Sequence, residues 1–553
     1  MKITEQLPSS KNALLLGPDG GLFSCLPRGI EEAPSLPGDR LPHTVFLGHR
    51  KSPEGLDALG ECIKKEIPFV VAGRGWSRGI PSSAVPAGGN TRIIGPGSAG
   101  LLVGPAPAKT VLLAAGSEIF SAVVKEAKAR SVPIGYGLSF GKKSAPGPLN
   151  AARIILESSG GGQLLVFIKK RLSRGRDLLE FAAEAARRGS LTALLEYDPL
   201  PGEDEVEEAA LRQMGIIVLD EPSDVVDMLA LFRAFDGRLP AGIIPDLGRG
   251  EMAALVRNEG SRRSLPFAPA GDGSLPRLKI ARGAAGLCIE GCKKTSFIPG
   301  IKRGLDALSL MLAAAKARPG TAGDMDGPGR CPIHPRPTEY DAKILLKTFG
   351  IPVARERLCR SFREASEAAD IIGYPVAVKV MSPAILHKSE ARVIALNLHD
   401  EEELRNAYGR TLEKARIANP GAKIRGVLVQ EMVRGGSEWR MEFRRDPRFG
   451  PVVEICASGV YGEILSDGVI RVAPFSEEEA AAMIAESRGR PLLLEGWMRK
   501  RLDKEAFASA LSAFSKLAFC EREVSRLEVN PIFVNRKGVL VVDAFLELKG
   551  REK

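Results

Sequence analysis

The sequence is poor in aromatic residues and contains no long apolar run. Phe, Trp and Tyr make up 5% of the 553 residues, too few to indicate a surface on which the bases of a nucleic acid stack. No run approaches the roughly 18 consecutive apolar residues of a membrane-spanning helix. The N-terminus also lacks the charged and then apolar pattern of a secretory signal. We therefore expect neither a nucleic-acid partner nor a membrane.

The eight cysteines are scattered and form no recognisable framework. Cys288 and Cys292 make a lone CxxxC pair without the second pair that a zinc site needs, and the other spacings indicate no disulfide pattern. A reduced, cytoplasmic compartment fits this cysteine usage best.

The chain is basic, with a net charge of +11 and a pI near 9.2. Its basic and acidic residues alternate, so the charge suits binding of anionic small molecules such as ATP and coenzyme A, and suits a plain soluble surface equally well. At roughly 150 residues per domain, the length predicts three or four domains.

The most informative stretch is YPVAVKVMSPAILHKSEARVIALNL, residues 374–398. It begins with a short apolar strand that contains Lys379, whose ammonium must meet an anion or reach water. A turn containing His387 follows, and then a second apolar strand. A strand lysine that faces such a turn suits the phosphates of a nucleotide, although a β-hairpin with a solvated lysine fits this stretch alone as well.

Further polar residues accompany apolar strands towards the C-terminus. VLVQE at 427–431 leads into a Gly-Gly turn, and LEVNP at 527–531 and VVDA at 541–544 place Glu528, Asn530 and Asp543 around a hairpin. Carboxylate and amide oxygens on adjacent strands suit Mg²⁺, which binds one or two carboxylates together with nucleotide phosphates.

Together these motifs resemble the ATP-grasp domain of the ADP-forming acyl-CoA synthetases of the acetate–CoA ligase type. The resemblance extends from about residue 338 to residue 547 and rests on motifs in consistent order: EYDAKILLKTFGIPV, GYPVAVKV, SPAILHKS, VLVQEM, RDPRFGPVV, RVAP and NPIFV. It implies an α/β chain in which Rossmann-like and flavodoxin-like parallel-sheet domains precede an α+β ATP-grasp domain.

The expected domains follow the family's order. They are a degenerate CoA-binding Rossmann-like domain at 1–105, a flavodoxin-like CoA-ligase domain at 106–237, a shortened second flavodoxin-like domain at 238–318, a linker at 319–337 and the ATP-grasp domain at 338–553. In the first domain, IIGPGSAGLL resembles the family's closing glycine-rich motif and offers Gly95 and Gly100 for CoA binding. The rival interpretation is a purely structural domain.

By resemblance, the ATP-grasp residues take defined roles. Lys379 would contact the phosphates, Gln430 and Glu431 would form the hinge beside the adenine, and Glu438 would reach the ribose. Asn530 and Asp543 match the magnesium ligands. His387 matches the histidine that relays phosphate on the ATP-grasp side, since a neutral imidazole nitrogen can attack phosphorus. Each could instead be an ordinary polar residue.

The sequence departs from the family at three places. After Leu195 the family carries a Ser-His-Thr-Gly loop whose histidine accepts the phosphoryl group, and here residues 196–201 read Glu-Tyr-Asp-Pro-Leu-Pro, with no histidine anywhere between 50 and 333. The family's Asp-Val-Gly-Gly becomes Glu-Ala-Arg-Val at 390–393, and its Gly-Leu-Gly-Gly becomes Cys-Ala-Ser-Gly at 456–459.

The resemblance implies the reaction acyl-CoA + ADP + phosphate ⇌ carboxylate + CoA + ATP, with ATP/ADP, Mg²⁺ and coenzyme A as cofactors. Its partners would be a small carboxylate or acyl-CoA and possible further copies of the chain. Two other functions stay open: a non-catalytic relative that binds nucleotide or CoA and regulates or scaffolds a true synthetase, and an ATP-grasp carboxylate–amine ligase.

Overall fold

The computed structural model divides into two compact units. Unit 1 comprises Met1–Gly202 and Leu211–Pro319, and unit 2 comprises Glu203–Ala210 and Gly320–Lys553. The residues that the structure describes are 13–16, 31–33, 44–47, 62, 69–72, 92–94, 100–103, 109–116, 118–140, 148–159, 161–169, 175–197, 204–235, 243–247, 251–263, 265–268, 276–281, 286–290, 295–316, 333–385, 393–459, 462, 468–493 and 502–550.

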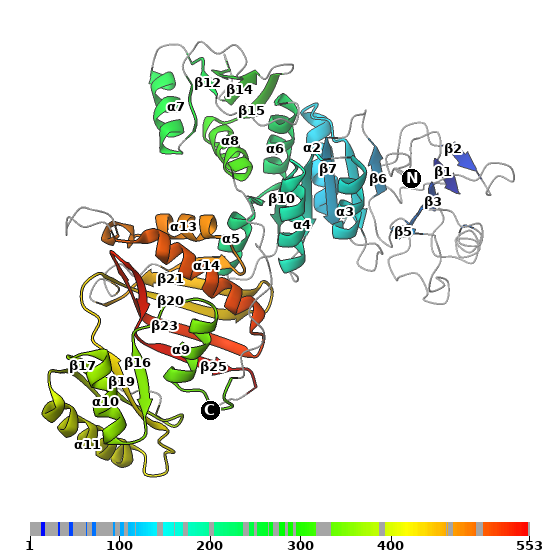
Figure 1. Cartoon of the computed structure of the whole chain (residues 1–553). Coiled ribbons are helices and arrows are strands. Elements are labelled where there is room, and N and C mark those ends of the chain that lie inside the picture. The colour runs from blue at the N-terminus through cyan, green and yellow to red at the C-terminus, as the bar shows by residue number, and fades with distance from the viewer. Residues whose placement is uncertain are drawn as a thin grey trace. The chain divides into compact units, whose positions relative to one another are not determined.

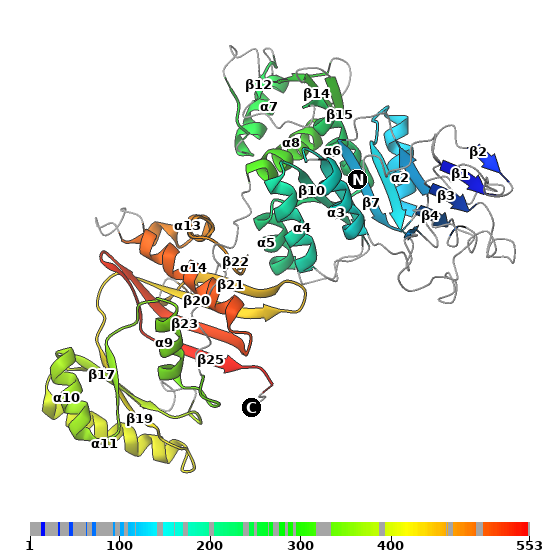
Figure 2. The same ribbon diagram turned by 45° about the vertical axis from the view of Figure 1, so that its right-hand side comes forward.

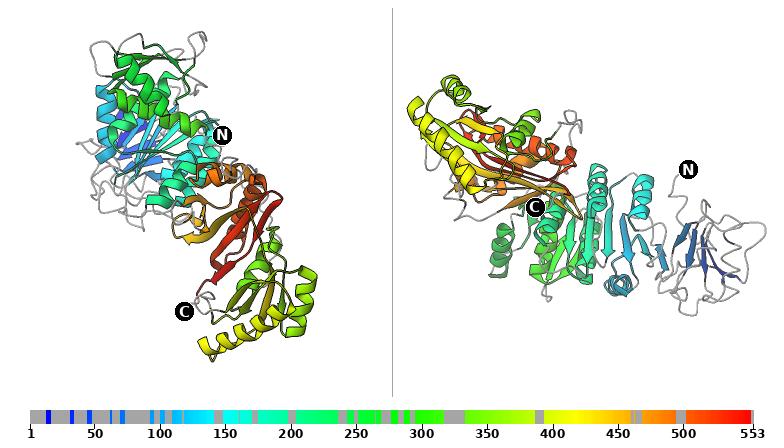
Figure 3. Two further views of the ribbon diagram at one scale, coloured as in Figure 1. Left: turned by 90° about the vertical axis from the view of Figure 1, so that its left-hand side faces the viewer. Right: turned by 90° about the horizontal axis from the view of Figure 1, so that it is seen from below.

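A small parallel sheet opens unit 1, as expected (Figure 3). Its order is β2-β1-β3-β4-β5, and all its pairings are parallel. Apolar runs such as ALLL and FVVA supply most of its strands, because parallel sheets are usually covered on both faces. The strands are β1 (Ala13–Leu16), β2 (Glu31–Ala33), β3 (Thr44–Leu47), β4 (Phe69–Ala72) and β5 (Arg92–Ile94).

The second sheet has the order β11-β10-β9-β7-β8-β6 (Figure 1). Apart from the antiparallel edge strand β6, its strands are parallel and follow the flavodoxin-like order. The strands are β6 (Gly100–Val103), β7 (Thr110–Ala115), β8 (Tyr136–Phe140), β9 (Leu164–Lys169), β10 (Leu191–Glu196) and β11 (Ile217–Leu219), and the helices are α2 (Glu118–Ala129), α3 (Pro148–Ser159), α4 (Gly175–Arg187), α5 (Asp204–Gln213) and α6 (Pro222–Ala234).

A third sheet, of order β12-β13-β14-β15, completes unit 1. Only β12 and β13 pair in parallel. β13, β14 and β15 are antiparallel neighbours because their short connections allow hairpins but no crossover helix. The elements are β12 (Ile244–Pro245), α7 (Glu251–Arg262), β13 (Arg277–Ile280), β14 (Gly286–Glu290), β15 (Thr295–Pro299) and α8 (Ile301–Lys316).

Unit 2 contains a small lobe built on the antiparallel sheet β16-β19-β17-β18. The buried valines of β17 pack with the alanine-rich face of α10 in one core. Ser361 and Asp400 cap the N-termini of α10 and α11 by accepting hydrogen bonds from main-chain N–H groups. The elements are β16 (Glu356–Cys359), α10 (Phe362–Ile372), β17 (Val376–Met381), β18 (Ile394–Leu398), α11 (Glu401–Ala418) and β19 (Gly426–Glu431).

The large lobe of unit 2 is built on the sheet β22-β21-β20-β23-β24, to which β25 adds by pairing with β23. Helices α13 and α14 cover one face of this sheet (Figure 2). Residues alternate along β20, so Trp439, Met441 and Phe443 enter the core of the lobe, whereas the residues between them lie on the opposite face. The elements are β20 (Ser437–Asp446), β21 (Gly450–Ala457), β22 (Val469–Val472), α13 (Glu477–Glu486), α14 (Lys504–Cys520), β23 (Val524–Asn535), β24 (Gly538–Val541) and β25 (Ala544–Leu548).

Helix α9 (Glu339–Thr348) connects the lobes of unit 2. Its apolar residues Ala342, Leu345 and Leu346 belong to the core of the large lobe. The following residues run beside the end of β24, where Val541 exchanges main-chain hydrogen bonds with Pro352 and Ala354 before the chain enters β16. α9 and this short crossing therefore fix where the two lobes meet.

None of the described helices is both long enough and apolar enough to cross a membrane.

Candidate functional site

A buried group of charged side chains lies where the small lobe meets α9 and the end of β24. Lys379 on β17 is only 4% exposed. Its ammonium donates to Glu339 Oε1 over 2.8 Å and to the main-chain oxygen of Val542 over 3.2 Å, and it lies 3.7 Å from Asp543 Oδ2. One lysine of the small lobe thus contacts α9 and the β24–β25 connection of the large lobe.

The group continues through side chains on α9, β16 and β19. The fully buried Lys343 donates to Glu339 and, over 2.8 Å, to Glu356. The Gln430 amide donates to Glu356 over 3.0 Å and to the Val542 oxygen over 2.9 Å. Charged groups remain stable at such depth only when they are paired and hydrogen-bonded. We name these residues the junction cluster: Glu339, Lys343, Glu356, Lys379, Gln430, Val542 and Asp543.

The junction cluster keeps Lys379 charged despite its burial. Burial alone lowers the pKa of this lysine, but the carboxylates of Glu339 and Asp543, with Glu356 further away, raise it above its ordinary value. The site therefore contains a permanent buried cation next to an acidic side chain.

Asn530 and Asp543 lie side by side at the edge of this cluster. The main-chain N–H of Asn530 donates to the main-chain oxygen of Asp543 over 3.1 Å, and β23 pairs with β25 immediately beside them. The Asn530 side chain accepts a hydrogen bond from Ser458 Oγ over 2.6 Å, and its amide lies 3.5 Å from Glu528 Oε1. The main chains of two oxygen-bearing residues are therefore paired here, and one of them, Asp543, has its carboxylate 3.7 Å from the Lys379 ammonium.

These residues fit a magnesium ion bound mainly through phosphate oxygens. Asn530 is exposed and the Asp543 side chain is 36% exposed, so both can face a ligand. Both offer the hard oxygen atoms that Mg²⁺ prefers. Among the described residues no group of three or more His, Cys, Asp or Glu side chains is arranged to hold a metal by itself. An ion held here would consequently depend on the nucleotide for most of its ligands.

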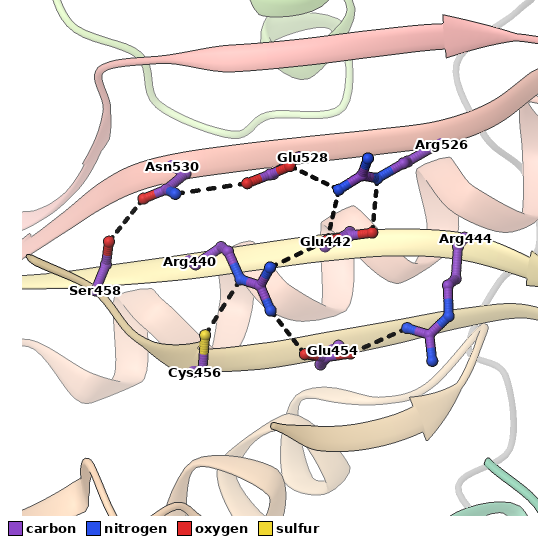
Figure 4. A network of polar contacts seen from close by, with 9 residues as sticks. All are labelled: Arg440, Glu442, Arg444, Glu454, Cys456, Ser458, Arg526, Glu528 and Asn530. Carbon is purple, nitrogen blue, oxygen red and sulfur yellow. Dashed lines mark hydrogen bonds and ion pairs between the residues drawn. The ribbon is translucent and has the colours of Figure 1, made fainter. Parts of the chain in front are cut away.

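Alternating arginines and glutamates cover the neighbouring face of the large-lobe sheet (Figure 4). Arg526 bridges Glu442 and Glu528, and Arg440 donates to Glu454 over 2.7 Å. Glu442 and Glu528 hydrogen-bond Arg526 and, with burial opposing them, raise its pKa. In the described contacts, each of these arginines pairs with a carboxylate, so among the described residues this face offers no arginine that is available for an anion. The face supports Asn530 through Glu528.

The three residues predicted for adenine and ribose are placed as follows. The Gln430 side chain is buried and contacts Glu356 and Val542, so it supports the junction cluster. The Glu431 carboxylate accepts from the N–H of Arg355 over 2.7 Å and from its guanidinium over 2.8 Å. Glu438 lies against the loop after β21, where a Cβ on Gly459 would come within 2.8 Å of its carboxylate.

The remaining predicted site residues are His387, Gly95 and Gly100. His387 and Gly95 lie outside the described residues. Gly100 begins β6, which pairs with β8 in the second sheet of unit 1 and not with the first sheet.

The residues that replace the family's histidine loop, 196–201, begin at the end of β10, on the carboxyl edge of that second sheet. After β10, the Tyr197 hydroxyl donates to the Ala115 oxygen at the end of β7 over 3.3 Å. Burial lowers the pKa of Lys169 at the end of β9, and the neighbouring Glu196 opposes this effect. A tyrosine and a Lys–Glu pair thus occupy the strand ends that precede the substituted loop.

Sequence reasoning missed Glu339, Lys343 and Glu356. The motif EYDAKILLKTFGIPV, residues 339–353, was read only as an opening helix and strand, and Glu356 follows it. A signal was available, because Glu339 and Lys343 are four residues apart, on the side of α9 that also carries the buried Ala342 and Leu346.

The site residues of unit 2 lie within a region that resembles known proteins. A family model described as an ATP-grasp domain matches residues 335–548. The acetate–CoA ligase (ADP-forming) II subunit beta of Pyrococcus furiosus is 40% identical over 215 residues, which are 38% of this chain and 91% of that protein. This chain belongs to the family of ADP-forming acetate–CoA ligases. The family predicted from the sequence motifs is therefore confirmed.

Other ligases and synthetases are also similar to this chain. The acetate–CoA ligase (ADP-forming) I subunit beta of Pyrococcus furiosus is 37% identical over 206 residues, covering 37% of this chain and 89% of that protein. Among solved structures, the dinucleotide-forming acetyl-coenzyme A synthetase 1 of Ca. Korarchaeum cryptofilum, in complex with coenzyme A and Ca-AMPCP, is 37% identical, with 38% of this chain and 93% of that chain covered and a TM-score of 0.37.

Proposed function

We propose that this chain is an ADP-forming acyl-CoA synthetase whose unit 2 binds a magnesium-bound adenine nucleotide and transfers its terminal phosphoryl group. The observation that carries the proposal is the buried, charged Lys379 beside Asp543, which itself adjoins Asn530. A fixed cation next to two oxygen ligands is the arrangement that nucleotide phosphates and Mg²⁺ require. The names of two matching ligases, both ADP-forming acetate–CoA ligase beta subunits, support the same reaction.

Each side chain then has a defined task. The Lys379 ammonium binds phosphate oxygens and offsets their charge, and Asn530 and Asp543 would hold Mg²⁺, which neutralises charge on the β- and γ-phosphates during transfer. Glu438 is the candidate for the ribose, with the end of β19 at Gln430 and Glu431 beside the adenine. The buried Gln430 amide contributes by holding the Val542 oxygen in place.

The full reaction consists of three successive transfers. Phosphate displaces CoA from the acyl-CoA, giving an acyl phosphate and free CoA. A histidine nitrogen then takes the phosphoryl group and releases the carboxylate. Finally ADP accepts that phosphoryl group to give ATP and the free histidine. On the ATP-grasp side His387 is the candidate relay, and residues 1–105, with Gly95 and Gly100, are the candidates for binding CoA.

The loop after β10 lacks the usual nucleophile, so the histidine of the first transfer has to come from elsewhere. A separate CoA-ligase chain can supply it, and two of the matched ligases are named as beta subunits. The domain limits given above, with a linker at 319–337, are part of this proposal.

The decisive experiment measures ATP formation from ADP, phosphate and a panel of acyl-CoAs with the purified full-length chain. Turnover that Lys379→Met abolishes supports the proposal. Incubation with γ-labelled ATP should also leave an acid-labile, base-stable phosphate on the protein, and His387→Ala should remove it.

Two results would replace the proposal. If ATP and Mg²⁺ raise Tm but no acyl-CoA gives turnover, even when a CoA-ligase chain that carries the histidine loop is added, the chain is a nucleotide-binding relative without this activity. If turnover survives His387→Ala, the relay on the ATP-grasp side is wrong.

A further inference from the structure

One carboxylate oxygen in the junction cluster serves two ammonium groups. Glu339 Oε1 accepts from Lys379, 2.8 Å away on β17, and from Lys343, one turn further along α9. Glu339 and Lys343 have no exposed side-chain surface, and the Lys379 side chain is 5% exposed. Water therefore cannot replace either partner of Glu339.

Among the described residues, the buried part of the cluster contains two lysines and two glutamates. Lys343 also donates to Glu356 over 2.8 Å, and the Glu356 side chain is likewise fully buried. Two buried cations therefore face two buried carboxylates, with the partly exposed Asp543 at the edge. Removing one member leaves an uncompensated charge at a site that water cannot reach.

Binding of a nucleotide would disturb the contact between Lys379 and Glu339. Lys379 cannot reach a phosphate and retain all its present partners, so its ammonium has to give up Glu339 at least in part. Without Lys343, this exchange would remove the second of the two lysines that contact Glu339 Oε1, and the strong attraction between Glu339 and Lys379 would hold Lys379 back. Lys343 removes this obstacle, because it stays bound between Glu339 and Glu356 whether or not Lys379 moves.

We propose that Lys343 is a positioning residue: by remaining the counter-ion of Glu339, it allows Lys379 to exchange that carboxylate for a phosphate of the bound nucleotide. This inference rests on the proposed function, since it requires the nucleotide to bind at Lys379. Lys343 itself touches no ligand and acts only through Glu339.

The test compares the affinities of ATP with Mg²⁺ and of adenosine for the full-length chain by isothermal titration calorimetry. Adenosine has no phosphates and does not require Lys379 to leave Glu339. Lys343→Met preserves the bulk of the side chain but removes its charge. Lys347→Met, an exposed position one turn further along α9, is the matched control. Far-UV circular dichroism and Tm establish that each variant is folded.

We expect Lys343→Met to weaken ATP about tenfold or more while adenosine affinity changes less than about twofold. Glu339→Gln frees Lys379 and leaves Lys343 paired with Glu356, so it should tighten ATP by about threefold. Combining the two substitutions removes one charge of each sign and should restore ATP affinity to within about twofold of the wild type. Lys347→Met should bind both ligands as the wild type does.

Several results would overturn the inference. An equal loss of ATP and adenosine affinity in Lys343→Met would show a purely structural role, and so would a loss that Glu339→Gln does not restore. If Lys343→Met does not fold, Glu339→Gln decides alone: tighter ATP binding supports the inference, and unchanged or weaker binding refutes it. A wild-type chain that binds no ATP with Mg²⁺ refutes the proposed function itself, whereas one that binds ATP equally well with Lys343→Met refutes only the role of Lys343.

Discussion

Ser458 donates a hydrogen bond over 2.6 Å to Oδ1 of Asn530, the oxygen that we propose as a magnesium ligand. The resemblance to the synthetases places a glycine at position 458, so this hydroxyl is a feature of the present sequence. A hydrogen bond to Oδ1 draws electron density from the atom and occupies one of its two lone pairs.

Ser458→Gly is therefore expected to tighten binding of ADP with Mg²⁺. A hydrogen bond contributes about 0.5–1.5 kcal/mol, which corresponds to roughly two- to tenfold in affinity. Titration of ADP at several Mg²⁺ concentrations measures the effect, and Ser458→Thr, which keeps the hydroxyl, should resemble the wild type. Weaker Mg²⁺-dependent binding would show that the hydroxyl orients Asn530 productively.

Asp543→Asn should reduce the dependence of nucleotide binding on Mg²⁺. The substitution retains the shape of the side chain but removes the charge that attracts the ion, and we expect a loss of about tenfold or more in ADP affinity with Mg²⁺. In the presence of EDTA the two proteins should bind ADP with similar affinity. Equal losses under both conditions would place Asp543 outside the metal site.

Trp439→Ala should destabilise the large lobe. The indole is fully buried, packs with Phe507 at a ring-centroid distance of 5.3 Å and donates to the Ser437 hydroxyl. Truncation of a buried aromatic side chain costs about 3–5 kcal/mol, measurable by urea denaturation of the unit 2 transition. Ile417→Ala, at a side chain that is 71% exposed, is the control and should change stability by less than about 0.5 kcal/mol. A similar effect of both substitutions would contradict the observed core.

Cys359 should make stability fall at alkaline pH. Burial raises the pKa of this thiol from 9.0 to about 11, so the unfolded chain releases the proton at a lower pH than the folded chain does. Its contribution is complete below pH 9 and is lost as pH rises towards about 11. The wild type should therefore lose more stability than Cys359→Ala between these pH values. Parallel loss in both proteins would contradict the shifted pKa.

The motifs of the sequence were enough to predict the family, and they nominated Lys379, Asn530 and Asp543 as site residues, which stay predictions. Each of these residues belongs to a short strand motif. Alternation along such a strand separates polar from buried positions, so the neighbouring residues indicate to which face of the sheet the side chain belongs. The tertiary structure brings these three residues, from separate motifs, to one place. The roles of Gln430 and Glu431 were less predictable, because a strand motif does not show which partner a side chain will find.

The sequence by itself predicted parallel-sheet domains before an ATP-grasp domain and showed the loss of the histidine loop, since these follow from local patterns of residues. Only the tertiary structure showed that the third sheet of unit 1 is mostly antiparallel, because strand direction depends on which neighbour each strand pairs with. Only the tertiary structure decided that Glu339 and Lys343 belong to the site. Their helix packs in the core of the large lobe, and its charged side chains contact strands of the small lobe. The role of Glu339, which lies between two lysines, depends on Lys379, a residue distant in the sequence, so local patterns do not reveal it.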